Sequence, residues 1–119
     1  MYREIKIGAK NVPMKATGAT PIRYRLVFKE DVLTEFSSVG DNYAVAIDTL
    51  SKLAFIMAMS ADDSVDMSKI NIDSFVNWLD GFEPFDITNA SDEIVDLYMG
   101  NTVGQSEVKK KARDAVKEN

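Results

Sequence analysis

The chain has 119 residues, of which 45% are hydrophobic, so it is long enough to bury the core of one domain without a metal or a disulfide. It has no cysteine and no histidine, which excludes disulfides, thiolate zinc sites and cysteine nucleophiles and removes the most common general base; we therefore expect no enzyme activity, no cofactor and no metal. The net charge of −5 is unevenly distributed. Residues 1–30 carry seven basic and two acidic residues, residues 31–103 carry two basic and fourteen acidic residues, and residues 104–119 carry five basic and three acidic residues.

The start of the chain has the pattern of a β-hairpin. Two short runs flank a turn that we expect at Gly8 and Asn11. In the first run isoleucines alternate with charged residues, as in a half-buried strand, and Pro13 would confine the second run to a sheet edge. The hairpin is expected over about residues 1–17.

A first helix is expected to begin with Thr20 as N-cap and Pro21 in the first helical position, and to end near Phe28. Its apolar face is expected to consist of Ile22, Leu26 and Val27. Asp31 is placed to cap a further short helical stretch, which residues 37–40 interrupt. The apolar residues of that stretch share one side: Val32, Leu33 and Phe36.

The strongest helical pattern covers about residues 42–61. Its second half, Leu53–Met59, is apolar on every side, and such a helix must be covered on every side by its own domain or by another chain. Both alternatives are open from the sequence. If another chain covers it, Phe55 and Met59 are candidate partner-binding residues.

Two shorter helices are expected in the last third of the chain. The first begins with a cap at Asn71 or Asp73, ends at Gly81 and carries its apolar residues at helical spacing: Phe75, Val76 and Leu79. Pro84 separates it from a last core helix over about residues 91–99. The inward side chains of that helix are expected to be Ile94, Val95 and Tyr98.

Residues 101–119 contain no aromatic residue and are rich in charge, so we expect a flexible, polar C-terminal tail. The predicted fold is mainly α, a small helical domain over residues 1–100 with a short N-terminal β-hairpin. The tail contains the basic run Lys109–Lys111, but the acidic middle of the chain would repel a phosphate backbone, so we expect no nucleic-acid binding.

In the acidic segment after the central helix, some oxygen-bearing side chains have the spacing of the ligands in an EF-hand calcium loop. Asp62, Ser64, Asp66 and Asp73 occupy positions one, three, five and twelve of an EF-hand loop. However, Met67 stands where the sharp turn needs a glycine, and an aspartate replaces the bidentate glutamate. The segment is therefore interpreted as a solvated acidic loop.

Three large aromatic side chains, Trp78, Phe82 and Phe85, cluster around Gly81 and Pro84. Exposed rings at such a turn would anchor a partner, because Trp and Phe are enriched in interface cores. The alternative is that they cap the core of their own domain. These three residues are candidate partner-binding residues alongside the two in the central helix.

Residues 12–28, followed by residues 31–36, resemble the tail assembly chaperones of long-tailed bacteriophages and of prophages of Gram-positive bacteria. The matching positions are Thr20-Pro21, Tyr24-Arg25 and Asp31. Lys29-Glu30 departs from the family pattern, where a glycine and a basic residue are expected. The order of hairpin, Thr-Pro helix start, central apolar helix and lysine-containing tail also agrees with that family.

The resemblance implies a non-catalytic protein of the bacterial host cytoplasm, absent from the mature virion. It implies two partners, the tape measure protein, which the chaperone keeps soluble, and the tail tube protein, which it helps to recruit. The longest apolar run is too short to span a bilayer, so no membrane association is expected. A homo-oligomer is possible, and the alternative function is a virion structural protein such as a head–tail connector or a tail completion subunit.

Overall fold

The computed structural model describes residues 1–32, 34–35 and 43–103. It is 59% helix and has an N-terminal two-stranded hairpin, which confirms the predicted mainly helical fold. Leu33, Phe36, the interruption at 37–40 and the tail from residue 104 lie outside the described residues. The elements, in chain order, are β1 (Tyr2–Ile7), β2 (Lys10–Lys15), α1 (Thr20–Phe28), α3 (Tyr43–Ala61), η1 (Met67–Lys69), α4 (Ile72–Leu79), α5 (Asp86–Asn89) and α6 (Ser91–Val103).

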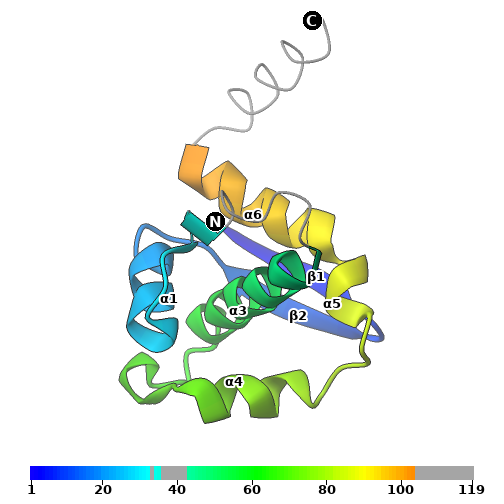
Figure 1. Ribbon diagram of the computed structural model, residues 1–119, viewed down its shortest axis with the longest axis horizontal. Helices are drawn as coiled ribbons and strands as arrows, with labels where there is room; N and C mark the ends of the chain where they lie inside the picture. The colour runs from blue at the N-terminus through cyan, green and yellow to red at the C-terminus, as the bar shows by residue number, and fades with distance from the viewer. Residues whose placement is uncertain (33, 36–42, 104–119) are drawn as a thin grey trace, which may run out of the picture.

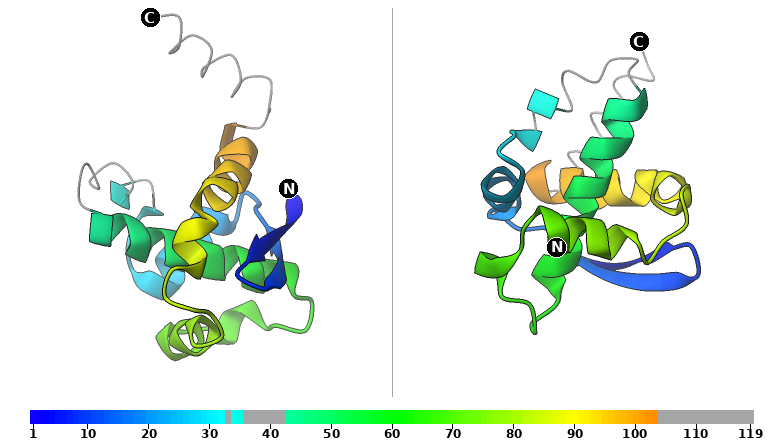
Figure 2. Two further views of the ribbon diagram at one scale, coloured as in Figure 1. Left: turned by 90° about the vertical axis from the view of Figure 1, so that its right-hand side faces the viewer. Right: turned by 60° about the horizontal axis from the view of Figure 1, so that its bottom comes forward.

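Helix α3 lies at the centre of the domain (Figure 1). It contacts β2, α1, α4, α5 and α6, and α6 crosses it in both views of Figure 2. Seven of its apolar residues are buried: Leu50, Leu53, Ala54, Phe55, Ile56, Met57 and Ala58. The alternative in which its own domain covers this helix is therefore correct for these residues.

The hairpin is antiparallel, with Tyr2 opposite Lys15 and Ile7 opposite Lys10. Ile5 and Ile7 are fully buried, as the alternation predicts. The turn is tighter than expected, because Gly8 has a φ of 63° and only one further residue separates the strands. The expected turn position of Asn11 is therefore wrong.

Helix α1 mainly buries a different face from the expected one, although Val27 of the expected face is half-buried and packs against the core. Tyr24 and Phe28, four residues apart, face the core, whereas Ile22 and Leu26 are 45% and 64% exposed. The two rings contact each other with centroids 5.2 Å apart, and Phe28 packs edge-on against Phe55 of α3. Aromatic rings bury more apolar surface than branched aliphatic side chains, which explains why the aromatic face turns inward.

The start of α1 also differs from the expected one. The N-cap is Ala19, and Thr20 is buried inside the first turn, where its hydroxyl accepts a hydrogen bond of 2.9 Å from the backbone N–H of Thr17. Pro21 lies in the first turn, as predicted. The cap at Asp31 is confirmed, because its carboxylate accepts a bond of 3.2 Å from the N–H of Thr34.

Helix α4 begins with a capping box. The Asn71 side chain accepts from the N–H of Ser74 at 2.9 Å, and the Ser74 hydroxyl accepts from the N–H of Asn71 at 3.2 Å. Of the apolar residues at helical spacing, Phe75 is buried, whereas Val76 is 48% exposed. The helix ends at Leu79, two residues before the expected end.

The last third of the chain contains one helix more than the sequence pattern indicates. The short helix α5 buries Ile87, and α6 continues to Val103, beyond the expected helix end near residue 99. Ile94 and Tyr98 are buried as predicted, Val95 is half-buried, and Leu97 is also buried.

The tip of the hairpin is fixed to the connection between α4 and α5. The Lys10 ammonium donates a 2.7 Å hydrogen bond to the carbonyl of Gly81 and lies 5.0 Å from the centre of the Phe82 ring. On the other side of the tip, Gly8 lies so close to the Asp86 carboxylate that a side chain at Gly8 would overlap it. These contacts join residues about seventy positions apart.

Replacing Gly8 with alanine is expected to lower the free energy of unfolding by about 1–3 kcal/mol, because of the positive φ and the clash with Asp86. Urea unfolding followed by circular dichroism measures this change. Gly18→Ala is the matched control, because nothing lies within 4 Å of a Cβ there. Equal stabilities of the two variants would contradict the prediction.

Candidate functional site

A groove opens between β2, the C-terminal end of α3 and α4. Its volume is about 400 Å³. Its lining is formed by Val12, Pro13, Ala58, Met59, Ala61, Asp62, Asp63 and Trp78. The groove is therefore mostly apolar, and its carboxylates come only from the loop that follows α3.

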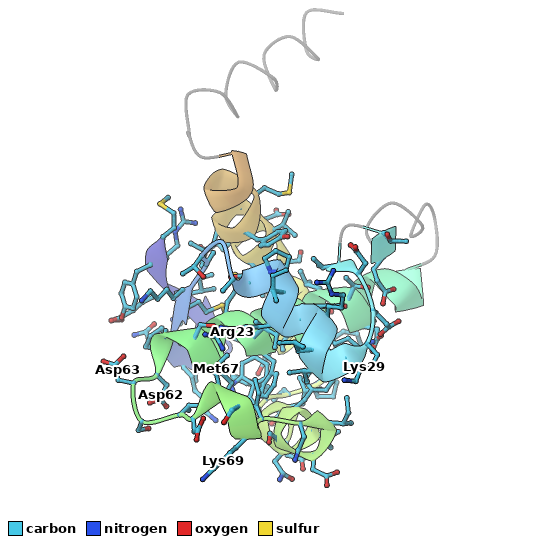
Figure 3. All side chains as sticks on the ribbon, turned by 90° about the vertical axis from the view of Figure 1, so that its left-hand side faces the viewer. Arg23, Lys29, Asp62, Asp63, Met67 and Lys69 are labelled. Atoms are coloured by element: carbon cyan, nitrogen blue, oxygen red, sulfur yellow. The ribbon has the colours of Figure 1, made fainter. Side chains whose placement is uncertain are left out.

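The two carboxylates give the rim of the groove a negative charge. Asp62 and Asp63 are exposed on the face shown in Figure 3. The Asp62 carboxylate accepts hydrogen bonds from Ser64, 2.6 Å from its hydroxyl and 3.0 Å from its backbone N–H, and these bonds hold the pKa of Asp62 below its usual range. Asp62 is therefore ionised at neutral pH, which favours a ligand with a basic group beside an apolar one.

The rigidity of the groove comes from a series of ring contacts that leads out of the core. The Phe55 ring packs against Phe75 at 5.5 Å and against Trp78 at 5.8 Å, and Trp78 contacts Phe82 at 4.9 Å. Trp78 and Phe82 are half-buried. Trp78 is thus held from below by the core while part of it lines the groove.

The five candidate partner-binding residues fall into three groups. Met59 and Trp78 line the groove, whereas Phe82 is half-buried beneath Lys10 and Phe85 is 69% exposed outside the lining. Phe55 is fully buried, so its expected contact with a partner is not supported in the folded domain. The alternative in which the aromatic cluster caps the core is correct for the buried parts of Trp78 and Phe82.

Four residues of this site were not predicted from the sequence: Val12, Pro13, Asp62 and Asp63. The hairpin and the loop after α3 are about fifty residues apart, and only the packing of β2 against α3 brings them together. The acidic lining residues were recognisable in the sequence only as part of the acidic loop after α3. No local pattern connects the loop to the hairpin.

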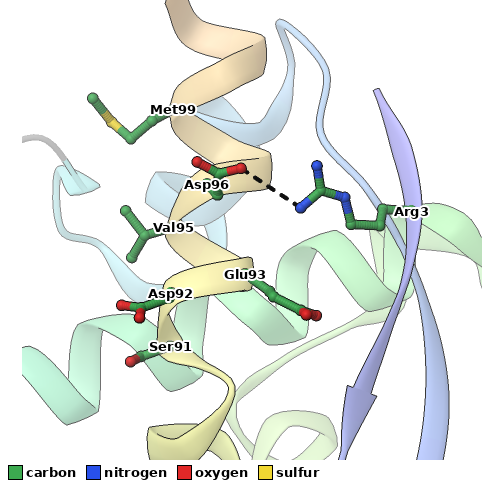
Figure 4. A pocket seen from close by; sticks show the side chains of 7 residues that line it. All are labelled: Arg3, Ser91, Asp92, Glu93, Val95, Asp96 and Met99. Atoms are coloured by element: carbon green, nitrogen blue, oxygen red, sulfur yellow. Dashed lines mark ion pairs between the residues drawn. The ribbon is translucent and has the colours of Figure 1, made fainter. Parts of the chain in front are cut away.

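A second hollow of about 550 Å³ lies beside α6 (Figure 4). Arg3 of β1 forms an ion pair of 3.7 Å with Asp96, and both side chains are about 40% exposed. Val95 and Met99 point away from Arg3, so the lining residues do not converge on one point. The acids in the first turn of α6 are favoured there by the helix dipole.

A polar cluster joins α1, the segment after it and α3. The Lys52 ammonium lies 2.6 Å from a Glu30 oxygen and 2.7 Å from an Asp48 oxygen. Burial lowers the pKa of Lys52, but the two carboxylates outweigh burial and raise it above its usual range. A hydrogen bond between the carboxyl groups of Glu30 and Glu35 lowers the pKa of Glu30 and raises that of Glu35.

Next to this cluster lies the buried hydroxyl of Tyr24, which has Thr49 and Lys52 of α3 as neighbours. Burial raises the pKa of Tyr24 far above its usual range, although nearby Lys52 acts in the opposite direction. The protonated forms of Tyr24 and Lys52 are therefore the forms that the fold requires. Their roles are structural, because they connect the buried side of α1 to α3.

Two further observations concern the described ranges 1–32, 34–35 and 43–103. No group of three or more acidic side chains there is arranged to hold a metal ion, and no helix in the same ranges has the length and apolar character needed to span a membrane. Comparisons with protein-family models, with curated proteins and with solved structures give no match for this chain.

Phe55 and Met59 are expected to respond differently to a buried charge. Phe55→Asp should lower the free energy of unfolding by more than about 4 kcal/mol and prevent folding, since the ring is fully buried. Met59→Asp should cost about 1–2 kcal/mol and leave the domain folded. Circular dichroism and urea unfolding distinguish the two, and a folded Phe55→Asp variant would contradict this placement.

The domain is expected to lose stability as the pH rises above about 10. The pKa values of Tyr24 and Lys52 are raised in the folded state, so the unfolded chain loses these protons first and is favoured at high pH. Relative to the wild type, Tyr24→Phe should reduce this pH dependence by up to about 1.4 kcal/mol per pH unit. Urea unfolding at several pH values tests this, and identical slopes would refute it.

Proposed function

We propose that this chain is a phage tail assembly chaperone, a non-catalytic protein that binds the tape measure protein, keeps it soluble and helps to recruit tail tube subunits. The observation that supports this most directly is the groove, which combines an apolar lining with an acidic rim. The likeness of residues 12–36 to the chaperone family supplies the identity of the partner.

The groove suits a segment with one large apolar side chain beside a lysine or arginine. Met59 is an adaptable apolar contact, and Trp78 is an aromatic anchor fixed by Phe55. Asp62 and Asp63 would steer a basic residue to the rim and raise the rate of encounter at low salt. A long, helical, aggregation-prone protein offers many such segments, so a weak site of this kind can act repeatedly along it.

The charge of the remaining surface supports the same role. Residues 31–103 carry fourteen acids and two basic residues, so copies bound along one partner would repel other complexes and remain in solution. Recruitment of tail tube subunits, action in the host cytoplasm and absence from the virion follow from the family resemblance. They are part of the proposal.

A virion structural protein, such as a connector or tail completion subunit, is the alternative. The exposed apolar pair Ile22 and Leu26 on α1 favours it, because a subunit of a permanent assembly presents more than one contact surface. Such a subunit would be present in purified particles, whereas an assembly chaperone would be absent from them.

Co-expression of this chain with the tape measure protein of the same phage or prophage tests the proposal. The soluble fraction of the tape measure protein should rise, and the two should co-purify. Met59→Lys should reduce both effects, since it places a cation on the apolar lining beside the acidic rim. The matched control is Ile72→Lys, at a residue of α4 that is 49% exposed and outside the groove.

If the two proteins neither co-purify nor differ in solubility, the chaperone function is wrong. Mass spectrometry of purified particles then decides whether the chain is a structural subunit. Equal effects of Met59→Lys and Ile72→Lys would show that the partner binds elsewhere.

A further inference from the structure

One edge of β2 does not pair with β1, and the hydrogen bonds at the open end of the hairpin define it. The amino group of Met1 donates to the carbonyl of Ala16, and the N–H of Ala16 donates to the carbonyl of Met1, both at 2.8 Å. Hydrogen-bonded and non-hydrogen-bonded pairs alternate along an antiparallel ladder. By this alternation the backbone groups of Asn11, Pro13 and Lys15 point away from β1. We call these backbone groups the free edge of β2.

The free edge of β2 is exposed and unpaired. Its three residues are exposed, and within the described ranges of the chain no other residue forms a hydrogen bond with these backbone groups. The edge offers the N–H groups of Asn11 and Lys15 as donors and the carbonyls of all three residues as acceptors. Pro13 has no N–H, and at this outward position the hairpin loses no bond of its own. Such a row of unpaired backbone groups is a template for a further strand.

The free edge of β2 borders the groove described above. Val12 and Pro13 of β2 belong to the lining, together with Met59 and Trp78. β1 instead contacts α5 and α6, and in Figure 1 it lies on the α6 side of the hairpin. Of the two outer edges of this sheet, the edge of β2 is therefore the one that lies next to an apolar groove with an acidic rim.

We propose that the free edge of β2 binds an extended segment of a partner protein as a third strand of the sheet. Successive side chains of a strand point to opposite faces. One face of the segment places an apolar side chain against Met59 and Trp78, and the basic side chains next to it lie beside Asp62 and Asp63. The segment therefore alternates apolar and basic residues. The identity of the protein that supplies it rests on the proposed function, whereas the mode of binding does not.

Pro13 disfavours a second copy of β2 as the occupant of this edge. The antiparallel pairing of two β2 edges that uses all the outward groups sets Pro13 of one copy opposite Pro13 of the other, so neither donor of the central pair exists. A partner segment without proline loses only one of these bonds. A chain that has not yet folded offers extended segments, so this mode of binding suits a chaperone that acts before the tape measure protein forms its helices.

A synthetic peptide tests strand addition without the tape measure protein. The probe is a short peptide with blocked ends, in which lysine alternates with valine on both sides of a central phenylalanine. In NMR of the isotopically labelled chain, at about ten times the Kd of the peptide, solvent exchange of the Asn11 and Lys15 amides should slow about tenfold, because both donate to the added strand. The amides of Glu4 and Lys6, on the outer edge of β1, are the internal control and should not change.

Methylation of single backbone nitrogens of the peptide separates an added strand from a helix or an irregular segment. In a strand, alternate N–H groups point to the same neighbour. Methylation at every second position is therefore expected to weaken binding at least about tenfold, whereas methylation at the positions between them leaves the affinity almost unchanged. Loss of binding without this alternation overturns the proposal, and so does a peptide that leaves the exchange of Asn11 and Lys15 unchanged.

Matched proline variants test the edge from the side of the protein. Lys15→Pro removes an outward N–H and no bond of the hairpin, and it is expected to weaken peptide binding at least about fivefold. Lys6→Pro is the control, because it removes the same charge and an outward N–H from β1. Circular dichroism first establishes that both variants are folded. Equal affinities of the two variants for the peptide overturn the proposal.

Failure of this inference is distinguishable from failure of the proposed function. If Lys15→Pro and Lys6→Pro keep the tape measure protein equally soluble, strand addition is overturned and the chaperone function stands. If the peptide binds with the expected alternation but the tape measure protein is not kept soluble, strand addition stands and only the proposed partner is wrong. Slower exchange of Asn11 and Lys15 as the concentration of the chain alone rises would assign the edge to a second copy and overturn the proposal.

Discussion

The need to cover α3 determines how the rest of this domain is arranged. From Leu53 to Ala58 every residue of the helix is buried, and no single neighbouring element can cover a cylinder of that kind. The hairpin covers one side, α1 another, and α4, α5 and α6 the remainder (Figures 1 and 2). Each covering element is short and has one buried face. The stability of each therefore depends mainly on its contact with α3 rather than on its own helix or strand propensity.

The same constraint produces the groove. β2 and α4 both pack on α3, but they diverge at its C-terminal end, where Met59 is only half-buried and the chain turns into the acidic loop. Trp78 lies at this edge and belongs both to the ring contacts of the core and to the lining. A binding surface that is continuous with a packed core needs little reordering when a ligand arrives, and this lowers the entropy cost of binding.

The fold class and the main elements were predictable because they depend on local patterns. Alternation identified the hairpin, and helical periodicity identified α3 within a residue at its start. Predictions failed where tertiary contacts decide which of several apolar faces of an element is buried. Either side of α1 was apolar enough to face inward, and the aromatic side does so because Phe55 lies there. The groove combines residues from the hairpin, the central helix and α4, and its composition follows from packing that no sequence window contains.

The anchored tip of the hairpin has a consequence for the order in which the domain forms during synthesis. Lys10 bonds to Gly81 and Gly8 packs against Asp86, so the hairpin, which is made before the helices of this domain, completes these contacts only after residues 81–86 are made. Two strands alone are only marginally stable in water, and until the second half of the chain is made the apolar side of the hairpin has no cover. Translation therefore passes through an interval in which Ile5 and Ile7 are accessible to general folding factors of the cell.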